Sequence, residues 1–362
     1  MLHALIMAGG FGTRFWPESR ANRPKQFLPL AGQGTMLQAA HARLAGMIDP
    51  GHVLVATNER FAGLVQEQLP DLAADAILGE PCRRDTAPCI GLAALDIWNR
   101  DAEATMLVLP ADQVIEPVAE FQAAIHAAVA IVDRDPTCLA TFGIRPTRPA
   151  VSYGYIECGE ALPALPNCSG IKAYRAQAFR EKPPEAVARQ YVAGGKHLWN
   201  AGIFVWKAAT VLESLAKHEP ELYARLRMID AARNGGEYGA VFEREFAAMR
   251  GVSIDYAVME RATNVAVVQA PFNWDDVGSW QSLARLHGTD ANGNTVIGKH
   301  LGLSTSGTIV RTSDDHLVVT LGLKDCLIVH APDVTLVADK HQEDEVRKLV
   351  QLAEEMGLQK YL

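Results

Sequence analysis

Short apolar runs rich in β-branched residues alternate with amphipathic helical patterns through the first half of the chain. The apolar runs predict strands, and apolar residues at three- and four-residue spacing predict helices. Thr35, Asn58 and Thr86 lie at or beside three of the helix starts and are suited to N-capping. The predicted strands are 2–7, 52–57, 76–78, 105–109 and 138–142, and the predicted helices are 35–47, 58–69, 86–98 and 117–133.

This alternation predicts an α/β fold with a Rossmann-like, mainly parallel sheet that is flanked by helices and joined by right-handed crossovers. Residues 151–270 contain a Gly/Tyr turn, two more helical stretches and further strands, and we expect them to continue the same domain. In sheets of this kind, ligands bind beyond the carboxyl ends of the strands. Candidate site residues are therefore sought directly after the predicted strands.

The pattern changes after about residue 290 to short Val/Ile/Leu runs separated by Gly, Ser, Asp and Asn. These runs predict a small, β-helix-like C-terminal domain. A last helix over 342–356 has one apolar face, which suggests docking onto the protein or onto a second subunit. That face consists of Val346, Leu349, Val350, Ala353 and Met356. We predict one domain over 1–288 and a second over 289–362.

Composition and charge narrow the class of protein. The chain has 362 residues, of which 49% are hydrophobic, and a formal net charge of -8, which disfavours binding to nucleic acid. Six cysteines without a C-x-x-C pair fit thiols in a reducing compartment better than disulfides or zinc. The N-terminus has no basic segment of a signal peptide, and the most apolar helical run is too short for a membrane span. We expect a cytoplasmic protein without membrane contact.

A glycine-rich segment, Ala8-Gly9-Gly10-Phe11-Gly12-Thr13-Arg14, follows the first predicted strand, and Lys25 follows in a proline-punctuated loop. Glycines there let the backbone approach a ligand and point amide groups at its phosphates. The segment is neither a P-loop nor a dinucleotide fingerprint. A tight turn alone would explain the glycines, but it would not explain the two cations, which suit a triphosphate.

Residues 9–27, GGFGTRFWPESRANRPKQF, resemble the signature loop of sugar nucleotidyltransferases, in the form of the mannose-1-phosphate guanylyltransferase branch. Further segments resemble this family in the same order and extend the resemblance over roughly residues 2–340. They are EPCRRDTAP (80–88), LPAD (109–112), YGYIE (153–157), EKP (181–183), WNAGIF (199–204), SIDYAVME (253–260) and WDDVGSW (274–280).

The resemblance implies a nucleotidyltransferase fold that transfers GMP from GTP to α-D-mannose 1-phosphate and releases GDP-mannose and pyrophosphate. The sugar phosphate is already ionised, so in-line attack needs positioning and positive charge, without a covalent intermediate. The resemblance also implies Mg²⁺ as the cofactor, and we expect a homodimer. Alternatives are a different base or hexose 1-phosphate, or a non-catalytic regulatory homologue, although such a homologue would be expected to lose a metal carboxylate or a loop cation. A dehydrogenase would need the missing dinucleotide fingerprint.

By similarity, Asp112 and Asp276 are the metal ligands, because Mg²⁺ prefers oxygen ligands. Each alone would be read as a turn or capping aspartate. Asp275 is a neighbour that could be mistaken for the ligand, and Asp276 is preferred because the D-V-G-x-W pattern begins there. The catalytic cations are Arg14 and Lys25.

For the base, the carboxylate of Glu80 can accept hydrogen bonds from N1–H and N2–H₂ of guanine, with Arg84 as a supporting contact. An alternative is that Glu80 ends a strand, and capping of the next helix by Thr86 is compatible with both interpretations. The implied nucleotide-binding residues are Ala8, Gly9, Gly10, Gly12, Thr13, Glu80, Arg84, Thr86 and Pro110.

The sugar-phosphate site draws on carboxylate and amide groups for hydroxyls and on an ammonium for phosphate. Its implied residues are Gly154, Glu181, Lys182, Asn200, Gly202 and Asp255. Glu181 and Lys182 alone would be read as an exposed ion pair, and Asp255 alone as a buried residue that holds loops together.

The chain departs from the family pattern at Asp85, where asparagine is common, and at Gln113, where histidine is common. Both departures leave the metal carboxylates and the loop cations intact. Many relatives carry a fused phosphomannose isomerase domain, and we expect that second activity to be absent from this chain.

Overall fold

The computed structural model describes residues 1–10, 12–164, 168 and 170–362. The chain forms two compact units. The first contains Met1–Gly9, His41–Pro110 and Ile115–Trp274, and the second contains Gly10–Ala40, Ala111–Val114 and Asp275–Leu362. The second unit thus combines most of the glycine-rich loop with the C-terminal strands, two segments that are far apart in sequence. The predicted boundary at residue 288 stays a prediction.

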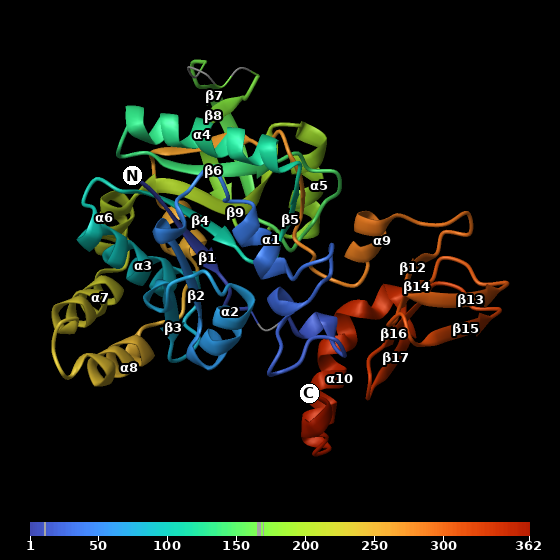
Figure 1. The fold of residues 1–362 in the computed structure, drawn as a ribbon. Coiled ribbons are helices and arrows are strands. Elements are labelled where there is room, and N and C mark those ends of the chain that lie inside the picture. Colours follow the sequence, from blue (N-terminus) through green and yellow to red (C-terminus); the bar gives the residue numbers. More distant parts are fainter. Residues whose placement is uncertain (11, 165–167, 169) are drawn as a thin grey trace. The chain divides into compact units, whose positions relative to one another are not determined.

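The first unit is built on a nine-stranded sheet in the order β3-β2-β1-β4-β9-β6-β10-β8-β7 (Figure 1). Strands β1 to β4 are parallel, β9 runs antiparallel between β4 and β6, and β10 is parallel to β6. The predicted mostly parallel sheet is confirmed. The strands are β1 (Leu2–Met7), β2 (Val53–Asn58), β3 (Ile77–Glu80), β4 (Thr105–Pro110), β6 (Leu139–Ile144), β7 (Tyr155–Ala161), β8 (Ala173–Arg180), β9 (His197–Lys207) and β10 (Val265–Gln269).

Helices flank this sheet: α3 packs against α6, α7 and β1, and α4 packs against β6, β9 and β10. The helices of the unit are α2 (Ala62–Gln68), α3 (Thr86–Arg100), α4 (Val118–Arg134), α5 (Glu185–Gly194), α6 (Ala208–His218), α7 (Pro220–Ala232) and α8 (Tyr238–Ala248). The expectation of two helices in 151–270 is wrong, because the described part of this stretch contains α5 to α8. Proline at the first position of α7 starts a new helix directly after α6 ends.

The predicted helix starts have three different outcomes. Thr35 and Gln38 exchange hydrogen bonds between side chain and backbone at the start of α1 (Met36–Ala42), which forms a capping box. Asn58 caps a 3₁₀ turn, Glu59–Phe61, that precedes α2. The prediction that Thr86 caps α3 is wrong, since the cap is Asp85, whose carboxylate accepts from the Thr86 amide at 2.9 Å.

The second unit contains a small β-helix. Most of its strands stack in parallel, with Val296, Val310 and Ile328 in register across β12, β14 and β16, and Leu301 beside Val319 across β13 and β15. Strand β17 completes the larger sheet and runs antiparallel to β16. The predicted C-terminal β domain is thereby confirmed. Its elements are α9 (Ser282–His287), β12 (Thr295–Ile297), β13 (Lys299–Leu303), β14 (Ile309–Arg311), β15 (Leu317–Leu321), β16 (Cys326–His330), β17 (Thr335–Asp339) and α10 (Val346–Glu355).

One apolar core joins the loop segment of the second unit to its β strands. Phe15, Leu28 and Leu30 of the loop are buried with Trp280 and with inward-facing residues of β14, β16 and β17. Burial of this many apolar side chains is the main driving force for the unit to fold as one body.

The last helix docks on part of its predicted face. Val346 and Ala353 of α10 are buried, whereas Leu349 and Met356 are exposed. The short strands β5 (Val114–Glu116) and β11 (Asn273–Asp275) lie where the chain passes between the units. Among the described residues, no helix has both the length and the apolar character needed to cross a bilayer.

Candidate functional site

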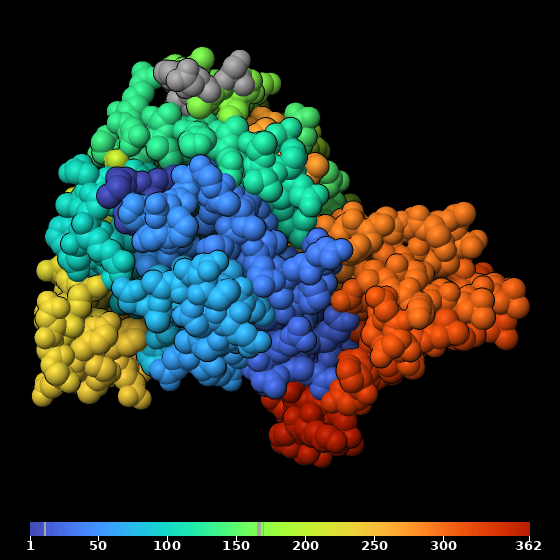
Figure 2. Space-filling model, viewed as in Figure 1, coloured from blue at the N-terminus to red at the C-terminus, as the bar shows by residue number. Residues whose placement is uncertain are grey.

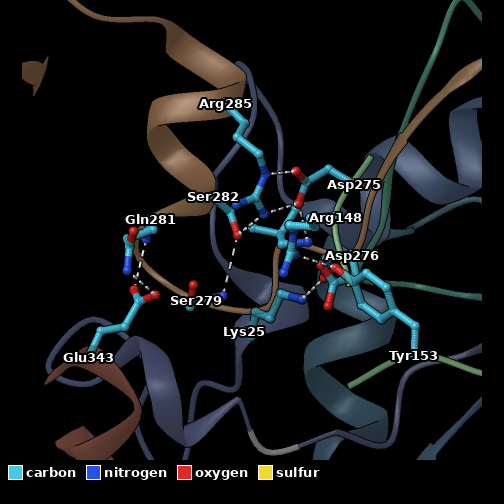
Figure 3. A network of polar contacts seen from close by, with 11 residues as sticks. Lys25, Arg148, Tyr153, Asp275, Asp276, Ser279, Gln281, Ser282, Arg285 and Glu343 are labelled. Atoms are coloured by element: carbon cyan, nitrogen blue, oxygen red, sulfur yellow. Dashed lines mark hydrogen bonds and ion pairs between the residues drawn. The ribbon is translucent and has the colours of Figure 1, made fainter. Parts of the chain in front are cut away.

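Lys25 is the centre of a charged cluster in the second unit. Its buried ammonium donates to Oδ2 of Asp112 at 2.8 Å, to the Asp112 carbonyl at 3.0 Å and to the Asp276 carbonyl at 2.8 Å. Figure 3 shows the Lys25 side chain ending beside Asp276. An ammonium has three donors, and all three are engaged here. Lys25 therefore ties together the two residues that the sequence predicts as metal ligands.

Asp275 and Asp276 have different surroundings. The Asp275 carboxylate receives Nε of Arg285 at 2.5 Å and Nη2 at 3.0 Å, and it also accepts from the Val277 amide at 2.7 Å (Figure 3). Both oxygens of the Asp275 carboxylate are therefore engaged with Arg285 and the Val277 amide and stabilise the local structure. This finding supports the choice of Asp276 as the metal ligand, although the assignment itself stays a prediction.

Arg14 and Asp276 meet over a glycine. A Cβ on Gly278 would lie 2.6 Å from Oδ2 of Asp276 and 3.4 Å from Nη1 of Arg14. Within the described part of the chain, the Arg14 side chain has no hydrogen-bond or ion-pair partner. The Arg14 guanidinium therefore has donors available to bind an anionic group of a ligand.

Gly12 has a positive φ of 61° and leads into a short 3₁₀ turn that contains Thr13 and Arg14. A side chain at Gly12 would overlap Cβ of Lys25, so the close approach of these two segments requires glycine. Gly10 has open space on its Cβ side, and Thr13 is exposed. Phe11, part of the same sequence motif, lies outside the described residues.

The carboxylates fit a magnesium ion better than a metal that needs an all-protein cage. Among the described residues, no group of three or more His, Cys, Asp or Glu side chains is placed to hold a metal. Mg²⁺ is usually held by one or two carboxylates, with water and phosphate oxygens as further ligands. Asp112 and Asp276 match that donor set.

The first unit buries a carboxylate at the carboxyl end of β3. Glu80 is 8% exposed, and burial raises the pKa of its carboxyl to about 7. The Cys89 thiol donates to this carboxylate, but Oε1 has no hydrogen-bond partner in the described structure. A Cβ on Gly9 would lie 3.8 Å from Oε2. Glu80 and Gly9 are thus neighbours, and Glu80 keeps an acceptor for a ligand.

The other predicted nucleotide residues of this unit have mainly backbone roles. Ala8 joins β1 to β2, since its amide donates to the Ala56 carbonyl at 2.7 Å. Pro110 is the last residue of β4. Arg84 donates through Nε to the Ala247 carbonyl at 3.1 Å, and Thr86 Oγ1 accepts from the Ile254 amide at 2.9 Å. The guanidinium of Arg84 is therefore committed to α8 in this structure.

Asp85 between them has φ 64° and ψ -169°. This backbone region is costly for any residue except glycine, by about 1–3 kcal/mol, and such strain clusters at functional sites. Contacts with the surrounding residues must therefore keep the turn after Glu80 in this strained backbone conformation.

A second group in the first unit surrounds Glu181. Lys182, at φ 47°, places its ammonium 2.9 Å from Oε1 of Glu181. Although partial burial lowers it, the pKa of Lys182 is raised on balance by its hydrogen bond to Glu181. A Cβ on Gly154 would lie 2.5 Å from Oε2 of Glu181, so any other residue there would displace the Glu181 carboxylate.

Asn200 connects this group to Asp255. Its Nδ2 donates to Oδ1 of Asp255 at 2.9 Å, while its Oδ1 accepts from the Thr141 hydroxyl at 3.1 Å and from the Gly202 amide at 3.2 Å. Burial, together with the charge of Glu181, raises the pKa of Asp255 to about 7. Asp255 begins a π-helical turn, Asp255–Met259, a feature often found at functional sites.

Sequence reasoning missed three supporting residues. Thr141 orients the Asn200 amide, Glu260 accepts from the Glu181 amide at 2.9 Å, and Cys89 donates to Glu80. Glu260 lies inside a quoted motif, SIDYAVME, and could have been proposed from it. Thr141 and Cys89 lie within a strand and a helix, where nothing in the local pattern separates them from core residues.

The predicted site residues thus form groups that are each coherent within one unit. Arg14, Lys25, Asp112 and Asp276 come together in the second unit. In the first unit, Glu80 lies beside Gly9, and Glu181 forms a group with Gly154, Lys182, Asn200 and Asp255.

Comparisons with known proteins identify the family of the chain. Residues 3–293 match the family model "Nucleotidyl transferase", and residues 298–352 match "MannoseP isomerase/GMP-like beta-helix domain". The xanthan biosynthesis protein XanB of Xanthomonas campestris is 38% identical over 98% of this chain and 73% of its own length. The mannose-1-phosphate guanylyltransferase of Escherichia coli K12 is 38% identical over 97% of this chain and 73% of its own length.

A solved structure is also similar over nearly its whole length. It is described as a mannose-1-phosphate geranyltransferase from Thermus thermophilus, with 35% identity, a TM-score of 0.84, and coverage of 98% of this chain and 99% of that one. The family model covers well over half of the chain, and several relatives exceed 30% identity over most of their length. The chain therefore belongs to the nucleotidyl transferase family of enzymes.

Proposed function

We propose that this enzyme transfers GMP from GTP to α-D-mannose 1-phosphate and releases GDP-mannose and pyrophosphate. The observation that carries the proposal is the Lys25 ammonium, which holds two carboxylate residues 164 positions apart in one cluster next to Arg14. Relatives that are 38% identical over almost the whole chain are named mannose-1-phosphate guanylyltransferases, which supports this choice of substrates.

The proposed roles in the second unit follow from charge. Asp112 and Asp276 would hold Mg²⁺, which supplies positive charge to the phosphate oxygens when it is bound. Arg14, which has no partner in the described structure, binds the triphosphate directly. Lys25 has its three donors engaged, so its main role is to orient the two aspartates and to balance their charge. The backbone of Gly10, Gly12 and Thr13 approaches the phosphates.

The proposed base contact is made by Glu80. Its Oε1 has no partner in the described residues, and a buried acceptor without a partner is costly unless a ligand satisfies it. An ionised carboxylate can accept from N1–H and N2–H₂ of guanine, whereas adenine and pyrimidines lack this pair of donors. This contact selects GTP, with Ala8, Gly9, Arg84, Thr86 and Pro110 shaping its surroundings.

The proposed sugar-phosphate contacts are made by the group around Glu181. The carboxylates of Glu181 and Asp255 and the amide of Asn200 suit sugar hydroxyls, and Lys182 suits a phosphate oxygen. The nucleophile is an oxygen of the phosphate, which is mostly ionised near neutral pH, so no side chain has to remove a proton from it. The group around Glu181 binds and orients the sugar phosphate for in-line attack.

The decisive experiment measures pyrophosphate release with each of four nucleoside triphosphates and with mannose, glucose and galactose 1-phosphates. We expect release with GTP plus mannose 1-phosphate to exceed every other pair by about a hundredfold or more, as unpaired polar groups penalise the wrong base. Equal release with UTP or dTTP would overturn the base assignment. No release with any pair would support a non-catalytic homologue.

We also propose that the enzyme is a cytoplasmic homodimer that associates through its C-terminal β domain. Five aliphatic side chains of β13 and β15 are 52–71% exposed: Leu301, Leu303, Leu317, Val319 and Leu321. Parallel register places them on one face of the two-stranded sheet. Contiguous exposed apolar surface of this kind marks interaction sites. These strands lie within the orange residues of Figure 2. The six cysteines are free thiols, which fits a reducing compartment.

A further inference from the structure

We propose that the β-helix domain holds the loop that carries Arg14 and Lys25 in its working conformation, and that Arg311 and Asp333 are positioning residues for the reaction. This inference rests on the proposed function. It concerns the part of the signature loop, Trp16 to Arg20, that the chemistry proposed above leaves without a role.

Arg311, at the end of β14, anchors the loop at Glu18. Its Nε lies 2.7 Å from Oε1 of Glu18, and its Nη2 lies 3.5 Å from the Pro29 carbonyl. The side chains of Arg311 and Glu18 are 15% and 17% exposed, so solvent screens this pair less than a surface ion pair. One guanidinium thus contacts the loop at two points eleven residues apart.

A second ion pair lies close by in sequence. Arg20 places Nη2 2.6 Å from the carboxylate of Asp333, which follows β16, and its Nε donates to the Pro17 carbonyl at 2.6 Å. Arg20 therefore fixes the local turn and attaches it to the β domain. In addition, Trp16 donates through its indole to the Tyr361 carbonyl at 2.7 Å.

These anchors are linked directly to the turn that carries Arg14. The amides of Glu18 and Ser19 both donate to the Phe15 carbonyl at 2.9 Å, and the Ser19 hydroxyl donates to the Gly12 carbonyl at 2.7 Å. Arg14 lies between Gly12 and Phe15 in the 3₁₀ turn. A shift at Glu18 would therefore be transmitted to the turn that carries Arg14.

Lys25 is coupled to the same turn through an aromatic ring. Its ammonium lies 5.7 Å from the centroid of the Phe15 ring, and Phe15 packs on Trp280 with ring centroids 5.0 Å apart. Phosphoryl transfer depends on positioned charges, and a misplacement of about 1 Å can cost about a hundredfold in rate. Contacts that set the position of this loop should therefore affect turnover although they touch no substrate.

The test compares Arg311→Met, Arg311→Lys and Asp333→Asn with the unchanged full-length enzyme. We expect Arg311→Met to lower kcat about 10- to 100-fold, with KM for mannose 1-phosphate within about twofold. Arg311→Lys retains the charge and should recover most of the lost turnover. A double variant, Glu18→Gln with Arg311→Met, should lose no more than Arg311→Met alone, because both changes remove the same contact.

The matched control is Lys207→Met. Lys207 is 16% exposed and pairs with Asp133 at 2.9 Å, but it lies at the far end of β9, beside Thr105 at the start of β4. This variant should lose stability and keep kcat. If Arg311→Met and Lys207→Met have equal kcat, the positioning role is refuted.

Amide hydrogen exchange of residues 12–30 gives a readout that needs no activity. We expect faster exchange of these amides in Arg311→Met and unchanged exchange in Lys207→Met. If the unchanged enzyme fails to release pyrophosphate from any substrate pair, the proposed function fails, while the exchange of the loop still decides whether Arg311 orders it. Unchanged exchange in Arg311→Met would refute the anchor itself.

Discussion

The ammonium of Lys25 forms a 2.8 Å ion pair with the carboxylate of Asp112 and also donates to the main-chain carbonyl of the same residue. Lys25 is almost fully buried, whereas the Asp112 side chain is 39% exposed. The lysine therefore supports the aspartate from the protein side and leaves part of the carboxylate accessible. This arrangement suits a residue that orients a metal ligand better than one that captures a phosphate.

Neighbouring aspartates should respond differently to the same substitution. We expect Asp276→Asn to lower kcat by about a hundredfold or more and to raise the Mg²⁺ concentration needed for half-maximal rate. Asp275→Asn weakens the Arg285 contact, so its main effect should be a lower Tm. Pyrophosphate release over a Mg²⁺ titration, together with thermal unfolding, measures both. Equal losses of kcat would show that the two positions do not have separate roles.

GTP binding should weaken as the pH falls through about 7. The proposed contact with guanine needs the ionised form of Glu80, and burial raises the pKa of this carboxyl to about 7. Below that value the ionised fraction falls about tenfold per pH unit, so the Kd for GTP should rise accordingly. Equilibrium binding between pH 5.5 and 8.5 would show the effect, and Glu80→Gln should bind weakly with a flat profile in this range.

Glu80→Gln should weaken GTP binding but increase the free energy of unfolding at neutral and alkaline pH. A carboxyl whose pKa is raised on folding binds its proton more tightly when folded, so stability is lost as the pH rises from 4.5, the pKa of an unperturbed glutamate, to about 7. Glu80→Gln removes that penalty, which amounts to at most about 3 kcal/mol. We expect a higher Tm for the variant at pH 8 and a smaller difference at pH 5. A lower Tm at pH 8 would contradict the assigned burial cost.

Two glycines should separate turnover from sugar binding. An alanine at Gly278 would press on Asp276 and Arg14, so kcat should fall about tenfold or more. An alanine at Gly154 would displace Glu181, so KM for mannose 1-phosphate should rise with little change in the KM for GTP. Gly63→Ala, in α2 with open space around it, is the control and should keep both constants. Steady-state kinetics with each substrate varied measures both constants. A changed KM for mannose 1-phosphate in Gly278→Ala, or a lower kcat alone in Gly154→Ala, would contradict the prediction.

Charge on the exposed face of β13 and β15 should dissociate the proposed dimer. Val319→Lys introduces an ammonium beside Leu301 in the centre of that face. We expect light scattering to report a dimer for the unchanged protein and a monomer for the variant, because an unpaired charge cannot be buried cheaply. His300→Ala, on the opposite face of β13, is the matched control. A monomer in the unchanged protein would refute the proposal.

Most of the fold follows from local pattern. The five predicted strands of the first half lie within two residues of β1, β2, β3, β4 and β6 at each end, because each is a short apolar run between turn residues. The insertion of β9 between β4 and β6 has no local signal, since the partners lie far away in sequence. For the same reason, periodicity could not show that residues 10–40 pack with residues 275–362.

At the site, residue types were predictable and their individual tasks were not. Asp275 and Asp276 have the same chemistry, and the structure separates them through the partner Arg285, which lies ten residues further on. Thr86 and Asp85 both suit a helix cap, and the positive φ of Asp85 brings its carboxylate to the Thr86 amide. Motif matching indicated which segments matter, whereas contacts across the fold decide what each side chain does.

The discontinuity of the second unit constrains how this enzyme can change. Glu18 and Arg311 are separated by 293 residues and yet form one contact. A hybrid gene that took its first thirty codons from one relative and its last seventy from another would unite two ends that had diverged separately. We therefore expect the first and last segments of the gene to be inherited together. Among relatives, a substitution at the position of Glu18 should be accompanied by a compensating substitution at the position of Arg311.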